Sequence, residues 1–174
     1  MKDLSPIFSS MDQASLKLLL QRAERVREHK KEEEAVEDGG WIAEFTLGGQ
    51  AFALPLEQLL SCIPLKGVTP VPLGKKGMIG ILRHQGKVIR VLSLASLLGS
   101  RGWRRDPSVL LVLKTGKEEL AVDCEEIPRV GQLPTSALQF AREMGGEGVV
   151  ELTQAGGKLL RYLNLEPLLA GLES

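Results

Sequence analysis

The spacing of apolar residues changes once along the chain, near residue 40. Before that point, five apolar residues recur at helical spacing and predict one amphipathic helix over about 11–29: Leu16, Leu19, Leu20, Ala23 and Val26. The segment from Lys30 to Asp38 is almost entirely charged, and Gly39-Gly40 follows it. Residues 1–40 are therefore expected to form an N-terminal helix and a charged linker. Such a helix packs on its own domain or docks on a partner, and the first arrangement is the commoner.

From Trp41 onward, apolar and polar residues alternate with the period of a strand that buries one face. Short runs of this kind, separated by turns that contain glycine, predict strands over about 41–47, 50–54, 59–65, 78–82, 87–93, 109–114, 119–123, 149–153 and 158–163. Short helical turns are expected at 94–98 and 166–169. Many short strands with glycine turns are typical of a sandwich or a barrel.

The second half of this region repeats the first. GKVIRVLSLASLL at 86–98 aligns with GKLLRYLNLEPLL at 157–169, and seven of the 13 positions are identical. FALPLEQL at 52–59 aligns with LAVDCEEI at 120–127 with similar apolar spacing. A supersecondary unit built twice predicts a mainly β fold of two small β-barrels side by side, joined near residues 100–107. Residues 41–174 are thus expected to form one domain, with a first half over about 41–103 and a second half over about 104–174. The repeated leucines Leu92/Leu163 and Leu94/Leu165 are expected at equivalent buried sites.

Composition narrows the class of protein. The chain has 174 residues with 22 basic and 22 acidic side chains, so it lacks the basic surplus of a general nucleic-acid binder. No stretch approaches 18 uninterrupted apolar residues, and the first residues lack the apolar core of a secretory signal. The protein is therefore expected to be cytoplasmic, without direct membrane insertion. Two cysteines, Cys62 and Cys124, are expected to be free thiols in a reducing compartment.

The motifs of common catalytic and cofactor sites are absent from the sequence. No glycine-rich phosphate loop precedes a helix, and the two histidines and two cysteines lack the paired spacing of zinc sites. His84, Ser93 and Asp123 form a conceivable triad, but no nucleophile elbow accompanies Ser93. We therefore expect no catalytic, metal or cofactor-binding residues, and a binding module rather than an enzyme. A small β-barrel enzyme is the alternative from a different class.

One apolar stretch is too dense for a strand with a single buried face. It comprises Leu59, Leu60, Cys62 and Ile63. Two explanations carry equal weight. Either the strand is buried on both faces by its own barrel and its neighbour, or part of it forms a surface for a partner.

Several of these segments, in this order and spacing, resemble the CheW family. They are FTLGGQAFALPLEQL at 45–59, PVPLG at 70–74, GMIGILRHQGKVIRVLSL at 77–94, LAVD at 120–123 and LLRYLNLEPLL at 159–169. The resemblance runs from about Trp41 to Leu172. It implies two SH3-like five-stranded β-barrels and a role as the coupling protein of bacterial chemosensory arrays. LLLQRAERV at 18–26 also looks like a helix that precedes the barrels in some family members.

The chain departs from the family pattern at two positions that face each other in some members. The family's Asn-Leu-Arg-Gly turn falls on Arg83-His84-Gln85-Gly86, so Gln85 stands where the family usually has Arg. A Glu that can face this Arg in some members is Ser61 here. Both partners of an ion pair are thus absent together, which a stable fold tolerates far better than the loss of one. Arg83, two positions away, would share a strand face with Gln85 and is a possible substitute.

The resemblance implies a non-enzymatic adaptor that joins methyl-accepting chemoreceptors to a CheA-type histidine kinase. A divergent scaffold of a gliding, pilus or developmental pathway is the alternative within the same class. The candidate partner-binding residues are Leu59, Ser61, Cys62, Ile63, Arg83, Gln85, Gly86 and Asp123.

Overall fold

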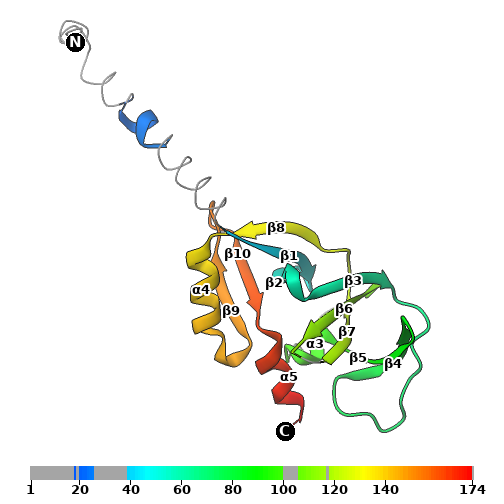
Figure 1. Ribbon diagram of the computed structural model, residues 1–174. Coiled ribbons are helices and arrows are strands. Elements are labelled where there is room, and N and C mark those ends of the chain that lie inside the picture. Colours follow the sequence, from blue (N-terminus) through cyan, green and yellow to red (C-terminus); the bar gives the residue numbers. More distant parts are fainter. Residues whose placement is uncertain (1–17, 19, 26–38, 100–105, 117, 174) are drawn as a thin grey trace, which may run out of the picture. The chain divides into compact units, whose positions relative to one another are not determined.

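The computed structural model describes residues 18, 20–25, 39–99, 106–116 and 118–173, which belong to two separate units (Figure 1). The first unit covers Met1–Asp38, and its described residues, 18 and 20–25, are helical. The remainder of the helix predicted over 11–29 lies outside the described residues. The second unit, Gly39–Ser174, contains ten strands in its described part, so the prediction of a mainly β protein is confirmed.

The ten strands form two five-stranded sheets. Sheet A has the order β8-β1-β2-β10-β9, with β8 (Arg129–Leu133), β1 (Gly40–Leu47), β2 (Gln50–Pro55), β10 (Leu159–Leu163) and β9 (Val149–Thr153). Sheet B has the order β3-β6-β7-β5-β4, with β3 (Leu59–Pro64), β6 (Val109–Thr115), β7 (Glu118–Cys124), β5 (Lys87–Leu92) and β4 (Met78–His84). Neighbouring strands are antiparallel except for two parallel pairs, β2–β10 and β5–β7.

Each sheet takes strands from both sequence halves. The β1–β2 hairpin of the first half lies between β8 and β10 of the second, and the β6–β7 hairpin of the second half lies between β3 and β5 of the first. Along the repeat, β1 to β5 correspond in order to β6 to β10. Under that correspondence the strand order of sheet A becomes the strand order of sheet B. The two halves therefore share one topology and have exchanged their first hairpins.

Equivalent positions of the repeat have equivalent local structure. Gly77 and Gly148, 71 residues apart, have φ of +87° and +88°. The carbonyl of Gly77 accepts a hydrogen bond from the N–H of Ser93 at 2.7 Å, and that of Gly148 accepts one from Asn164 at 2.8 Å. The four repeated leucines are all buried, with at most 2% of each exposed: Leu92, Leu94, Leu163 and Leu165.

Three apolar clusters hold the domain together. The central cluster combines both sheets, and in it Phe45 and Phe52 of sheet A stack with ring centroids 6.1 Å apart. Burial of each such side chain contributes about 1.5–3 kcal/mol. The sheet A cluster packs Ile42, Leu160 and Tyr162 against α4 (Thr135–Glu143), and the sheet B cluster is formed by its own strands.

The closed barrels expected from the sequence are not formed by strand pairing. In the described chain no hydrogen-bonded ladder joins β3 to β4 or β8 to β9. In sheet B the outer edge of β4 is occupied instead by the preceding loop, where Thr69 and Ile81 exchange backbone hydrogen bonds of 2.8 and 2.9 Å. Gly80 permits this approach, because a Cβ there would lie 2.3 Å from the Thr69 carbonyl oxygen.

Short helices occupy the ends of the sheets. η1 (Leu56–Gln58) follows β2, α3 (Leu94–Leu97) follows β5, η2 (Gly145–Glu147) precedes β9, and α5 (Leu165–Glu173) follows β10. The sequence predicted α3 closely and α5 only in part, and it predicted neither β8 nor α4. The α4 helix begins after Pro134 and turns Ala137, Leu138 and Ala141 toward sheet A.

Asp123 holds the start of α3. Its Oδ1 accepts a hydrogen bond of 2.7 Å from the backbone N–H of Leu94, the first residue of the helix. Both residues are buried, with 5% of Asp123 and 1% of Leu94 exposed. A buried backbone N–H without an acceptor is costly, so the carboxylate stabilises the junction between β7 and α3.

We expect Asp123→Ala to lower the free energy of unfolding by about 1–3 kcal/mol, because the Leu94 N–H then loses its acceptor. Asp123→Asn retains an oxygen acceptor and should lose less. Denaturant unfolding followed by circular dichroism measures both. Asp106→Ala, at an exposed position, is the control and should change stability by less than about 0.5 kcal/mol. Unchanged stability of Asp123→Ala would contradict this role.

Candidate functional site

The dense apolar stretch forms β3, an edge strand whose two faces meet different clusters. Leu59 and Cys62 pack against the central cluster, and Ile63 packs against the sheet B cluster. None of the three is fully buried. Leu60, at the register shift between Leu59 and Ser61, is 48% exposed. β3 is therefore partly covered on both faces and presents Leu60 as its exposed apolar side chain.

The turn between β4 and β5 is built from two residues of positive φ, Gln85 at +48° and Gly86 at +79°. This is the pattern of a type I′ hairpin turn, whose twist matches that of the flanking strands. Arg83, Gln85 and Gly86 are exposed. Because β4 ends at His84, Gln85 lies outside the strand, so the alternation that would place Arg83 and Gln85 on one face does not reach it.

His84 connects the candidate partner-binding residues of β3 with those of the β4–β5 turn. Its Nε2 lies 3.5 Å from Oγ of Ser61, across the two edge strands of sheet B. The residue beside Gln85 therefore contacts Ser61, and the two positions at which the sequence departs from the family pattern lie close together. Sequence reasoning considered His84 only for metal binding and catalysis. Its place next to the turn was the available signal for a role in this surface.

The structure does not bring Asp123 to this surface, because it is buried at the start of α3. It also separates the residues of the conceivable triad. Ser93 and Asp123 meet at α3, whereas His84 lies at the other end of the β4–β5 hairpin, roughly 20 Å away for a strand of six residues. Among the residues that the structure describes, no group of three or more His, Cys, Asp or Glu side chains is placed to hold a metal ion.

The thiols of Cys62 and Cys124 lie on the face of sheet B that packs in the central cluster. Cys62 is half-buried and Cys124 is buried. Burial raises the pKa of Cys62 above its usual value, and it raises the pKa of Cys124 to about 11. Because the thiolate is the reactive form, both groups are weak nucleophiles near neutral pH.

The profile of the CheW-like domain matches residues 42–173, which is almost the whole of the second unit. The chain belongs to the CheW-like family. It is 22% identical over 130 residues to the chemotaxis protein CheW of Thermotoga maritima, covering 74% of this chain and 86% of that protein. Among solved structures it is similar to the scaffolding protein TtCheW from Thermoanaerobacter tengcongensis. That match has a TM-score of 0.60 and 17% identity, and it covers 75% of this chain and 87% of the other.

Members of the CheW-like family are non-enzymatic scaffold proteins, in agreement with the sequence prediction that this protein is not an enzyme. The structural likeness at 17% identity shows a shared fold, and the match over residues 42–173 shows the family. None of the helices in the described residues has the length and apolar content needed to cross a membrane.

The turn geometry predicts that Gln85→Asn stabilises this CheW-like protein. Asn tolerates the left-handed conformation better than Gln, and Asn-Gly is the preferred pair for this turn, so the free energy of unfolding should rise by about 0.5–1 kcal/mol. Gln132→Asn, in the extended strand β8, is the control and should give no gain. Thermal and denaturant unfolding of both variants measure this, and an equal effect at the two positions would contradict it.

The thiol environments predict selective alkylation. At pH 8, a pKa of about 11 leaves roughly one thiolate in a thousand at Cys124, so iodoacetamide should modify native Cys62 well before Cys124. Mass spectrometry of peptides after timed alkylation measures both rates. In urea the two cysteines should react at similar rates. Alkylation of native Cys124 as fast as Cys62 would show that its burial is not maintained in solution.

Proposed function

We propose that this protein is an adaptor that couples methyl-accepting chemoreceptors to a CheA-type histidine kinase in a bacterial chemosensory array. The observation that carries the proposal is the CheW-like match over residues 42–173. The relative from Thermotoga maritima is a chemotaxis protein, and the similar solved structure is a scaffolding protein. The adaptor would act in the cytoplasm and be recruited to receptor arrays near the membrane.

The proposed receptor-binding surface consists of Leu60, Ser61, Arg83, His84 and Gln85. All five belong to the edge strands of sheet B or to the turn that follows β4. Leu60, Arg83 and Gln85 are exposed. Arg83 forms no ion pair with another described residue.

A second proposal concerns the fold of sheet B. Its two edge strands, β3 and β4, approach each other closely enough for Ser61 to contact His84 at 3.5 Å. This contact supports a sheet that curls toward the SH3-like barrel implied by the family, with the Thr69 segment taking the position of a direct β3–β4 pairing.

The matched absence of charge at Ser61 and Gln85 indicates a partner surface that has diverged with them. In their place, Nε2 of His84 lies 3.5 Å from Oγ of Ser61. The same departure from the family pattern favours, as a second candidate, a divergent scaffold for a gliding, pilus or developmental pathway. In either pathway the surface would face a partner that lacks the usual acidic group.

The test is a titration of the purified protein against the signalling tip of its receptor and against the regulatory domain of its kinase, at two salt concentrations. Wild type should bind both. Gln85→Arg should weaken receptor binding about fivefold, or about 1 kcal/mol, because the new charge is partly desolvated without a counterion. Kinase binding should not change.

Gln154→Arg is the matched control, since Gln154 lies in the corresponding hairpin turn of sheet A. It should leave receptor binding unchanged. Tighter, salt-sensitive binding by Gln85→Arg would contradict the neutral receptor surface. Failure of the wild type to bind either partner would overturn the adaptor function itself.

A further inference from the structure

The segment between β3 and β4, residues 65–77, carries an apolar tip. Figure 1 shows this β3–β4 loop standing out from the edge of sheet B. A turn forms its tip, in which the N–H of Gly74 donates to the carbonyl of Val71 at 3.3 Å. Leu73, inside this turn, is fully exposed, and Val71 is 37% exposed. The loop therefore holds two large apolar side chains in solvent.

The backbone of the turn is strained at Leu73, whose φ is +59°. Pro72 precedes it with a φ that its ring fixes near −65°, so only the third residue of the turn has positive φ. This is the pattern of a type II turn, which favours glycine at that position, and a bulky residue there is a rare outlier. Strain of this kind is characteristic of functional sites. The fold thus keeps Leu73 at the tip although glycine would fit the backbone better.

Lysines flank the tip on both sides. Lys66 precedes it, and Lys75 and Lys76 follow it. All three are exposed, and none forms an ion pair with another described residue. The β3–β4 loop contains no Asp or Glu that could offset these three charges.

The positive charge extends beyond the loop. The sequence from Gln58 to Arg105 has nine basic residues and no acidic residue, although the whole chain carries 22 of each kind. Two of the nine, Lys87 and Arg90, are neutralised by carboxylates of β7 at 2.7 and 2.6 Å. The lysines of the β3–β4 loop are not, so the loop attracts an anionic surface.

An apolar tip between cations matches the layers of an anionic bilayer surface. There apolar side chains enter below the headgroups, while lysines extend their charges to the phosphates. A protruding side chain needs a matching hollow in a protein partner, but a fluid bilayer accepts it without one. Thr69 is fixed by backbone hydrogen bonds to Ile81, and Pro70 and Pro72 restrict the chain beyond it. Binding therefore orders little that is not already ordered.

We propose that the β3–β4 loop attaches this protein to an anionic lipid surface. Val71 and Leu73 enter the headgroup region, and Lys66, Lys75 and Lys76 contact lipid phosphates. Two apolar side chains and three lysines bind weakly by themselves, so the attachment is reversible and no segment crosses the bilayer. It requires neither receptor nor kinase, and it goes beyond the proposed adaptor function.

Cosedimentation of the full-length protein with lipid vesicles measures the attachment. One set of vesicles contains phosphatidylcholine alone, and the other contains about one third phosphatidylglycerol. In low salt the partition coefficient should be at least fivefold higher on the anionic vesicles, and it should fall as salt screens the lysines. Equal partition into both sets, or none into either, would overturn the proposal.

The substitution Leu73→Gly separates binding from folding. Glycine adopts positive φ freely, so the variant should unfold no more easily than wild type. Its partition into anionic vesicles should fall about fivefold, because the apolar tip is lost. Val88→Ala is the control, since Val88 is 67% exposed on β5 and lies outside the loop. Undiminished binding by Leu73→Gly would contradict insertion of the tip.

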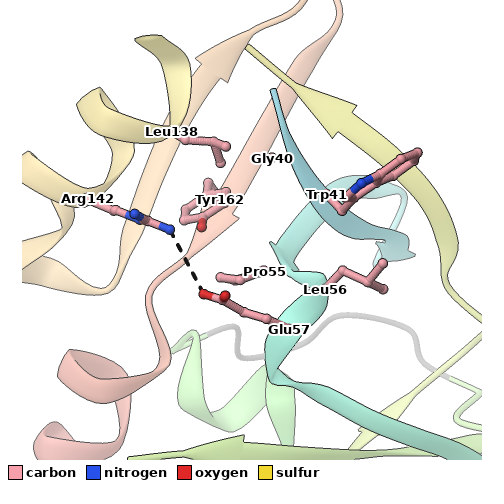
Figure 2. Close-up of a pocket in the computed structure, with 8 residues that line it drawn as sticks. All are labelled: Gly40, Trp41, Pro55, Leu56, Glu57, Leu138, Arg142 and Tyr162. Carbon is pink, nitrogen blue, oxygen red and sulfur yellow. Dashed lines mark ion pairs between the residues drawn. The ribbon is translucent and has the colours of Figure 1, made fainter. Parts of the chain in front are cut away.

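A matched pair of double variants tests the lysines. Lys75→Gln with Lys76→Gln should weaken binding at least fivefold and reduce its dependence on salt. Arg129→Gln with Arg142→Gln removes the same net charge elsewhere and should have little effect. Arg129 is exposed in β8, and Arg142 is 66% exposed on α4, where Figure 2 shows it beside Glu57. An equal loss in both variants would show a response to net charge alone and would overturn the proposal.

Two further outcomes would assign the loop to a protein. Leu73→Gly might leave vesicle binding intact and weaken binding to the receptor tip or to the kinase regulatory domain, which would make the occupant a protein partner. Self-association of the free protein that Leu73→Gly abolishes would make it a second copy. Either result would overturn the lipid proposal, and neither depends on whether wild type couples receptor to kinase.

Discussion

The domain depends on the exchange of hairpins between its two halves. Among the described strands, the outer edges of the β1–β2 hairpin pair with β8 and β10, and those of the β6–β7 hairpin pair with β3 and β5. Unpaired backbone N–H and C=O groups inside a fold are costly. Each hairpin needs strands of the other sequence half to complete its hydrogen bonds, so neither half can fold without the other. The central cluster imposes the same condition, because its phenylalanines and leucines come from both sheets. One cooperative domain follows from this arrangement.

The repeated scaffold carries different surfaces on its two sheets. The segment between β3 and β4 is a loop that pairs with the edge of β4 through Thr69. The equivalent segment between β8 and β9 contains α4 and η2, and α4 packs on sheet A. The turn between β4 and β5 presents Gln85, whereas the corresponding turn in sheet A is closed by Gly156 and Gly157, both at positive φ. The two sheets are therefore suited to different partners.

Local patterns in the sequence were sufficient for most strands and for the repeat, because alternation and glycine turns act over a few residues. They were insufficient for β8 and α4. β8 contains Gly131 and only two large apolar residues, and α4 exposes Phe140 while it buries the small Ala141. Alternation of apolar and polar residues carries no information about which strand pairs with which. It therefore could not predict that the two halves exchange hairpins. The burial of Asp123 was unpredictable for the same reason, since its partner Leu94 lies 29 residues away. The hairpin turn at Gln85 and Gly86 could be predicted from the sequence, because a glycine between two strand-like segments indicates a tight turn by itself.

The exchange also determines the order in which the sheets are completed during synthesis. Sheet B has all its strands once β7, which ends at Cys124, has been synthesised. Sheet A is complete only after β10, which ends at Leu163. Strands β1 and β2 are thus the first to leave the ribosome and among the last to be fully paired. In the interval both edges of their hairpin are open, a state in which strands associate with other chains. The segment from Lys30 to Asp38, which precedes β1 in the sequence, is almost entirely charged, and charged residues next to an open strand edge oppose its pairing with other chains.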